Sequence, residues 1–154
     1  MMENNLIVSS GVGDDFNLEG AITNRSNSYT SVDMTKFNDA EKAKFFTAIN
    51  SPKFKIADFV NKEIKMQNIY CEVIETTDMA TGELIKLVRT IIIDDEGNGY
   101  SCASKGVFNS FSKIVNPYFY GAPPYDKPLI VVPTLVKTQK GFNTLTLIPK
   151  GFVK

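Results

Sequence analysis

The sequence predicts a mainly β protein in which one helix interrupts a series of five strands. Residues 84–93 are apolar and rich in β-branched side chains, and the acidic, glycine-containing turn 94–99 joins them to a short strand at 100–103. Residues 104–115 then place their apolar side chains on one face of a helix, with Ser104 in the N-cap position. With strands expected on both sides, this order predicts a five-stranded OB-like barrel whose helix lies between the third and fourth strands.

The barrel is expected to cover residues 63–148. The spacing of apolar residues in its first strand slips between Met66 and Ile69, which indicates a bulge where the strand bends around the barrel. After the helix, apolar segments at 129–136 and 142–148 are expected to form the fourth and fifth strands.

An N-terminal extension is expected before the barrel. Residues 1–15 are interpreted as a loose leader, and residues 16–62 as an extension that contains a short helix. Asn38 and Glu41 have the spacing of a capping box at the start of this helix, and Pro52 disfavours helix in the residue before it. All 154 residues are expected to form a single domain, because this length is typical of one.

The composition argues against several classes of protein. The hydrophobic share of 43% is that of a folded chain, and no apolar run approaches the roughly 20 residues that span a membrane. The first residues are polar and do not resemble a secretory signal, so we expect a cytoplasmic protein. Without histidine or a C-x-x-C pair, no metal site is expected. Cys71 and Cys102 lie in apolar segments and are predicted to be reduced and buried.

The net charge of zero conceals a strong asymmetry along the chain. Residues 63–103 hold eight acidic and three basic residues, whereas residues 104–154 hold seven lysines and one acidic residue, a local charge of +6. Two interpretations remain open for the basic part. It forms either a solvated lysine-rich face or a track for a polyanion, since binding follows local potential rather than net charge.

Aromatic residues gather in the same basic part of the chain. Four of them lie in the proline-rich loop 118–125 that follows the predicted helix. Single-stranded nucleic acids stack bases on aromatic rings while lysines contact phosphates. An OB barrel binds on its second and third strands and on the loops between strands one and two and strands four and five. Rings near prolines also often serve only as loop anchors, and this alternative stays open. The candidate nucleic-acid-binding residues are Arg89, Tyr100, Lys105, Lys113, Tyr118, Tyr120, Tyr125, Lys137, Lys140 and Phe142.

Catalysis has little support in the sequence, and we predict that the protein is not an enzyme. Asp94, Asp95 and Glu96 are adjacent carboxylates of the kind that hold two catalytic metal ions. Three acidic residues before Gly97 and Gly99 are more typical of a solvated hairpin turn, and we adopt that interpretation.

Three segments of the chain together resemble a known family. They are residues 89–111, RTIIIDDEGNGYSCASKGVFNSF, and the upstream residues 45–52 and 58–64, FFTAINSP and DFVNKEI. On these segments, residues 16–148 look like the small single-stranded-DNA-binding proteins encoded by phages of Gram-positive bacteria.

The resemblance implies a function. Such a protein would coat single-stranded DNA with little sequence preference during phage replication or recombination, in the host cytoplasm, without a cofactor and with phage replication proteins as further partners. Many single-strand-binding proteins recruit partners through a flexible acidic tail. Residues 148–154 are basic and apolar here, so recruitment by such a tail is not expected.

The alternative is a phage structural or host-interaction protein that uses a small β barrel to bind a protein partner. The two hypotheses differ in where exposed aromatic rings and lysines lie. A shared concave face favours nucleic acid, whereas an exposed flat apolar patch favours a protein partner.

Overall fold

The computed structural model describes Leu18 and residues 28–154, which form a mainly β structure. The predicted leader, residues 1–15, lies outside the described residues, as does much of the extension. In chain order the elements are β1 (Ser28–Thr30), the 3-10 helix η1 (Met34–Lys36), α3 (Asp39–Asn50), β2 (Phe54–Lys55), the 3-10 helix η2 (Ile56–Phe59), β3 (Ile64–Met66), β4 (Asn68–Thr77), β5 (Leu84–Ile93), β6 (Gly99–Cys102), α4 (Lys105–Ile114), β7 (Leu129–Lys137) and β8 (Asn143–Phe152).

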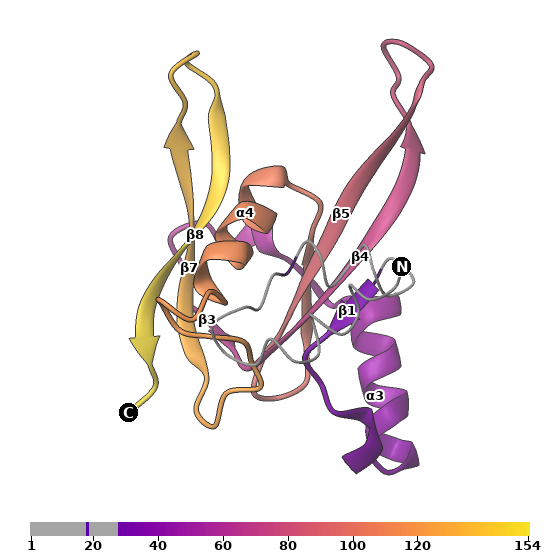
Figure 1. The fold of residues 1–154 in the computed structure, drawn as a ribbon, viewed down its shortest axis with the longest axis vertical. Helices are drawn as coiled ribbons and strands as arrows, with labels where there is room; N and C mark the ends of the chain where they lie inside the picture. Colours follow the sequence, from indigo (N-terminus) through magenta and orange to yellow (C-terminus); the bar gives the residue numbers. More distant parts are fainter. Residues whose placement is uncertain (1–17, 19–27) are drawn as a thin grey trace.

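The strands form two sheets that one bent segment joins (Figure 1). The larger sheet has the order β1-β4-β5-β6-β2, and the smaller one has the order β3-β7-β8. Only Gln67 separates β3 from β4, and its backbone N–H donates to the Ile93 carbonyl (2.9 Å). The chain therefore passes from one sheet to the other at Gln67, inside the interval from Met66 to Ile69 where the sequence predicted a bulge.

The mainly β class and the position of the helix are confirmed, but closure into a five-stranded barrel is not. Helix α4 lies between β6 and β7, which correspond to the third and fourth predicted barrel strands. In the described part of the chain, β8 pairs with β7 alone, and β6 pairs with β5 and β2. Among residues 28–154, the two sheets therefore share no hydrogen-bonded edge that would close a barrel.

Helix α4 occupies the edge of β8 where a closing strand would pair. The Ser110 hydroxyl oxygen accepts the backbone N–H of Leu147 (3.0 Å), and the same hydroxyl donates to the Gly106 carbonyl (2.9 Å). Gly106 lies so close to β8 that a Cβ there would collide with the Leu145 carbonyl oxygen. Because Ser110 satisfies an edge N–H that strand pairing would otherwise satisfy, the helix replaces a strand along this edge.

The core lies between the two sheets and α4. Val107, Phe111 and Ile114, which the sequence placed on one helical stripe, are buried. They share this core with buried residues of both sheets, including Ile64, Met66, Ile69, Ile92, Leu129 and Val131. Cys71 and Cys102 are free thiols; Cys71 is buried as predicted, whereas Cys102 is only half-buried.

Helix α3 covers the opposite face of the larger sheet. It begins with the predicted capping box, in which the Asn38 side chain accepts the N–H of Glu41 (2.8 Å) and the Glu41 carboxylate accepts the N–H of Asn38 (3.0 Å). Its buried side chains, Phe45 and Ala48, pack with Ile91 of β5. The short helix predicted for the extension is thus confirmed, and it lies on the outer face of β5.

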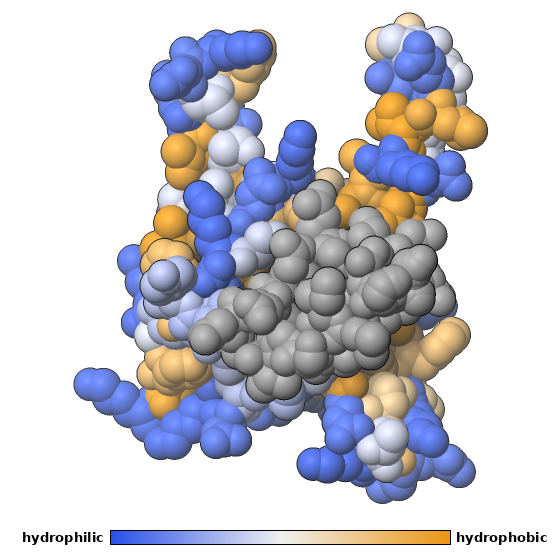
Figure 2. All heavy atoms as spheres, in the orientation of Figure 1, coloured by the Kyte–Doolittle hydropathy of each residue, from blue (hydrophilic) through white to orange (hydrophobic). Residues whose placement is uncertain are grey.

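Two long hairpins project from this body in the same direction (Figure 1). Past the residues that pair with β1 and β6, strands β4 and β5 continue as a two-stranded ribbon, the β4–β5 arm, residues 73–88. The outer part of the β7–β8 hairpin, residues 134–144, is the β7–β8 arm. Figure 2 shows the arms as separate projections with an open space between their outer parts, which we call the inter-arm cleft.

Replacing Ser110 by Ala should lower the stability of the protein. The change leaves the Leu147 N–H without its acceptor, which should reduce the free energy of unfolding by about 1–3 kcal/mol. Ser112→Ala is the matched control, because the Ser112 hydroxyl donates to the Phe108 carbonyl of its own helix (3.1 Å). Urea denaturation of the two variants measures the difference, and equal losses would show that Ser110 does not hold α4 to β8.

Candidate nucleic-acid interface

The β7–β8 arm combines lysines with exposed apolar side chains. Lys137 and Lys140 are exposed, and Phe142, beside the turn, has 68% of its surface exposed. The turn is ordered by two bonds: the Thr138 N–H donates to the Phe142 carbonyl (2.7 Å), and the Thr138 hydroxyl accepts the Phe142 N–H (3.3 Å). Gly141 adopts φ +86°, in the left-handed region that favours glycine. The arm therefore presents one aromatic ring beside two cations.

The inner face of each arm continues the core face of its sheet, because side chains alternate along a strand. On β7, Leu135 and Lys137 follow the buried Pro133 on this face. On the other arm, Glu75 and Lys86 stand opposite each other on the corresponding face. Leu135 is a candidate that was not predicted from the sequence, although the alternation of side chains along β7 places it on the core face one step past the last buried residue, Pro133. Both inner faces border the inter-arm cleft, and the first turn of α4 lies between the two hairpins (Figure 1).

Charge divides the two arms. The β4–β5 arm holds Glu75, Asp78 and Glu83 with one lysine, a net charge of −2, whereas the β7–β8 arm holds two lysines and no acidic residue, a net charge of +2. Lys105, exposed in the first turn of α4, adds another positive charge beside the cleft. A polyanion is therefore attracted to the β7–β8 arm and the start of α4, and it is repelled by the β4–β5 arm.

The outer face of β5, which an OB barrel would use for binding, is covered by α3. Arg89 lies on this face, where its guanidinium forms an ion pair with Glu72 (2.9 Å) and donates to the Ile49 carbonyl near the end of α3 (2.8 Å). Arg89 thus ties α3 to the sheet, and Glu72 balances its charge. Its predicted contact with nucleic acid stays a prediction.

Tyr100 belongs to the core in the described conformation. It is 8% exposed, its ring stacks on Phe54 (4.8 Å between centroids), and its hydroxyl donates to Asp94 Oδ2 (2.9 Å). Burial, and then the hydrogen bond to Asp94, raise the pKa of the Tyr100 phenol above its ordinary value, so the hydroxyl stays a neutral donor. The ring has no exposed face for a base, and binding through Tyr100 would require the core to rearrange.

The aromatic loop after α4 is partly anchored and partly exposed. Tyr125 is buried and its hydroxyl donates to the Gly121 carbonyl (2.6 Å), while Tyr120 packs edge-to-face on Phe152 (5.5 Å between centroids). Tyr118, in contrast, is 93% exposed. The alternative interpretation of these rings as loop anchors thus fits Tyr120 and Tyr125, and Tyr118 alone of the three is free to stack.

The candidate binding residues do not form one cluster. One group follows the β7–β8 arm and the first turn of α4, a second lies at the opposite end of α4, and two residues belong to the framework of the larger sheet (Figure 1). The first group is Lys105, Lys137, Lys140 and Phe142, the second is Lys113, Tyr118, Tyr120 and Tyr125, and the framework residues are Arg89 and Tyr100.

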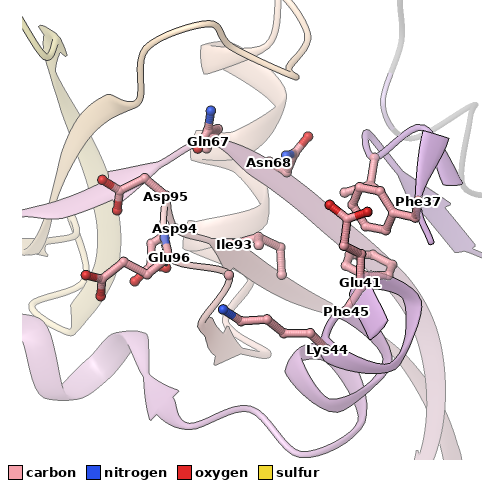
Figure 3. A pocket seen from close by; sticks show the side chains of 12 residues that line it. Phe37, Glu41, Lys44, Phe45, Gln67, Asn68, Ile93, Asp94, Asp95 and Glu96 are labelled. Atoms are coloured by element: carbon pink, nitrogen blue, oxygen red, sulfur yellow. The ribbon is translucent and has the colours of Figure 1, made fainter. Parts of the chain in front are cut away.

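An acidic pocket of about 420 Å³ lies between α3 and the turn after β5 (Figure 3). The carboxylates of Glu41, Asp95 and Glu96 line it, with Lys44 as the basic residue of the lining. Asp94 is buried and accepts the backbone N–H groups of Glu96 and Asn98 (both 2.9 Å), as expected for a hairpin turn. Phosphates are repelled by this pocket. The described residues contain no cluster of three side chains suited to hold a metal ion.

The basic arm with its exposed ring is a surface that attracts an extended polyanion, and the family to which the chain belongs is consistent with this. The chain belongs to the family of phage single-stranded DNA-binding proteins, because the model of this family, of the Phi29 type, matches residues 23–148. The protein therefore binds single-stranded DNA in phage replication, and the resemblance found in the sequence is confirmed. This family is one of DNA-binding proteins rather than enzymes.

No curated protein and no solved structure matches the chain. In the described residues, no helix is both long and apolar enough to cross a membrane.

Tyr100→Phe should destabilise the protein without weakening DNA binding. The change removes the donor to Asp94 and should lower the free energy of unfolding by about 1–3 kcal/mol. Tyr118→Phe is the matched control and should leave stability unchanged, because the ring is exposed. Chemical denaturation and anisotropy with labelled oligothymidine measure the two effects. Weaker binding at unchanged stability would instead place Tyr100 in the interface.

Proposed function

We propose that single-stranded DNA binds along the β7–β8 arm and the first turn of α4. The observation that carries this assignment is the exposed ring of Phe142 at the tip of the arm, between the level of Lys137, which pairs with Asn143, and Lys140 in the turn, on an arm without acidic residues. A base stacked on such a ring contributes roughly 1–3 kcal/mol, while the lysines contact the neighbouring phosphates.

We infer that the two sheets are an open variant of the OB plan, built from residues 63–148 with residues 16–62 as an extension of the same domain. The order of strands, the bent first strand and the place of α4 support this inference. In an OB barrel the loops between strands one and two and strands four and five flank the bound strand. In this chain those loops are the tips of the β4–β5 and β7–β8 arms, and only the β7–β8 tip has the positive charge that suits contact with DNA.

The expected mode of binding is tolerant of sequence, because every base offers a face for stacking and every nucleotide offers a phosphate. Such a protein coats single strands during phage replication or recombination in the host cytoplasm, where phage replication proteins are its expected partners. No specific observation favours the alternative of a phage structural or host-interaction protein.

Lysine and aromatic substitutions on the β7–β8 arm should have different effects. Lys137→Ala or Lys140→Ala should weaken binding and reduce the log–log salt slope by about 0.7 for each phosphate that the variant no longer neutralises. Phe142→Ala should lower the binding free energy by roughly 1–3 kcal/mol and leave the slope nearly unchanged, because stacking releases few counterions. Anisotropy titrations with oligothymidine between about 50 and 200 mM salt measure both quantities.

Two variants control this experiment. Lys42→Ala removes an exposed lysine from α3, and Tyr118→Ala removes an exposed ring from the aromatic loop. Both should bind like the unmodified protein. A loss for Lys42→Ala equal to that for Lys137→Ala would contradict the assignment to the arm. A loss for Tyr118→Ala equal to that for Phe142→Ala would extend the interface to the aromatic loop.

We further propose that the protein has no nuclease activity. Asp94, the buried member of the carboxylate turn, already accepts hydrogen bonds from Glu96, Asn98 and Tyr100. Labelled single-stranded DNA incubated with the protein and Mg²⁺ or Mn²⁺ should therefore stay intact. Cleavage that disappears in an Asp94→Asn, Asp95→Asn variant would overturn this expectation.

A further inference from the structure

The tip of the β4–β5 arm exposes apolar side chains in a negatively charged setting. Met79 is 97% exposed and Leu84 is 73% exposed. The turn that carries them is ordered: the Asp78 N–H donates to the Glu83 carbonyl (2.8 Å), and the Gly82 N–H donates to the Asp78 carbonyl (2.7 Å). DNA is repelled by this acidic tip, so the exposed apolar side chains there have a different role from those of the β7–β8 arm.

A groove of about 350 Å³ lies on the other side of the molecule, between α4 and β8. Apolar side chains dominate its walls, and Lys113, exposed in the last turn of α4, is its charged residue. Lys150 follows the groove on β8, and none of the described residues that line it is acidic. Its apolar lining comes from Ile114, Phe119, Val136, Ile148 and Pro149.

The tip and the groove are complementary in charge and in surface type. The tip places Asp78 and Glu83 around an exposed Met79, and the groove places Lys113 beside an apolar trough. Methionine is flexible and fills irregular apolar gaps well. In Figure 1 the tip of the β4–β5 arm projects away from α4 and β8, the elements that line the groove, so the tip of one copy does not reach the groove of the same copy and the contact joins different copies.

We propose that the tip of the β4–β5 arm of one copy docks into the α4–β8 groove of the next copy along the same DNA strand. The contact joins two different surfaces, so it repeats from copy to copy and builds an open row rather than a closed dimer. A single tip buries little area, and the contact is therefore weak between free molecules. On a shared strand the neighbours are held at high effective concentration, and the contact appears as cooperative binding.

This inference rests on the proposed function, and one titration series separates the two. Binding is measured on the shortest oligothymidine that holds one copy, which gives the intrinsic affinity, and on an oligomer several times longer, which adds the cooperativity between neighbours. Met79→Ser and Lys113→Glu should each reduce the cooperativity by about tenfold, which corresponds to about 1.4 kcal/mol, and Met79→Ser should change the intrinsic affinity by less than about twofold. Lys127→Glu, an exposed lysine outside the groove, is the matched charge control and should keep the cooperativity.

Charge reversal on both surfaces gives the decisive comparison. Glu83→Lys alone should lose cooperativity, and Glu83→Lys combined with Lys113→Glu should regain it, because the pair is restored with opposite polarity. Failure of the unmodified protein to bind the short oligomer would overturn the proposed function itself. Non-cooperative binding by the unmodified protein, or no recovery in the double variant, would overturn only the docking proposal. A Lys113→Glu variant that loses intrinsic affinity on the short oligomer would show that the groove holds DNA instead.

Discussion

The contact between α4 and the edge of β8 is the constraint on which the rest of the structure depends. The contact requires glycine at position 106, because the helix there approaches the Leu145 carbonyl too closely for a Cβ atom. It also requires the hydroxyl of Ser110, which accepts the Leu147 N–H. Because the helix satisfies this edge, β6 and β8 do not pair and the sheets stay open. The same contact fixes the base of the β7–β8 hairpin, and with it the direction in which the basic arm projects.

The exposed surfaces of the molecule differ in charge, and this difference decides which of them repel a polyanion and which attract one. Helix α3, tied down through Arg89, covers the face that an OB barrel would offer to a ligand. The pocket beside α3 is acidic, as is the β4–β5 arm. The β7–β8 arm and the start of α4, in contrast, attract a polyanion, and the proposed DNA site lies there. The α4–β8 groove reaches this arm at Val136 and otherwise lies along the later part of α4 and β8, away from the first turn of the helix.

Local signals in the sequence predicted local structure well. The capping box at Asn38 and the apolar stripe of α4 depend on residues close together in the chain, and both are present. Barrel closure depends on contacts between distant residues. Whether a given tyrosine is buried or exposed depends on such contacts as well. Tyr100 and Tyr118 look alike in the sequence, but pairing with Ile92 brings the first into the core and the chain reversal after α4 leaves the second exposed. Nothing local marks Ser110 as the acceptor for a strand many residues away.

The two-stranded construction of the arms has an evolutionary consequence. Their outer residues contribute nothing to the buried core, so a change in arm length or in the side chains at a tip leaves the packing of the body intact. Strength of DNA binding and stability of the fold can then vary independently from one phage to another. Among proteins built on this plan, we expect the hairpin tips to diverge rapidly while the glycine and serine of α4 remain unchanged.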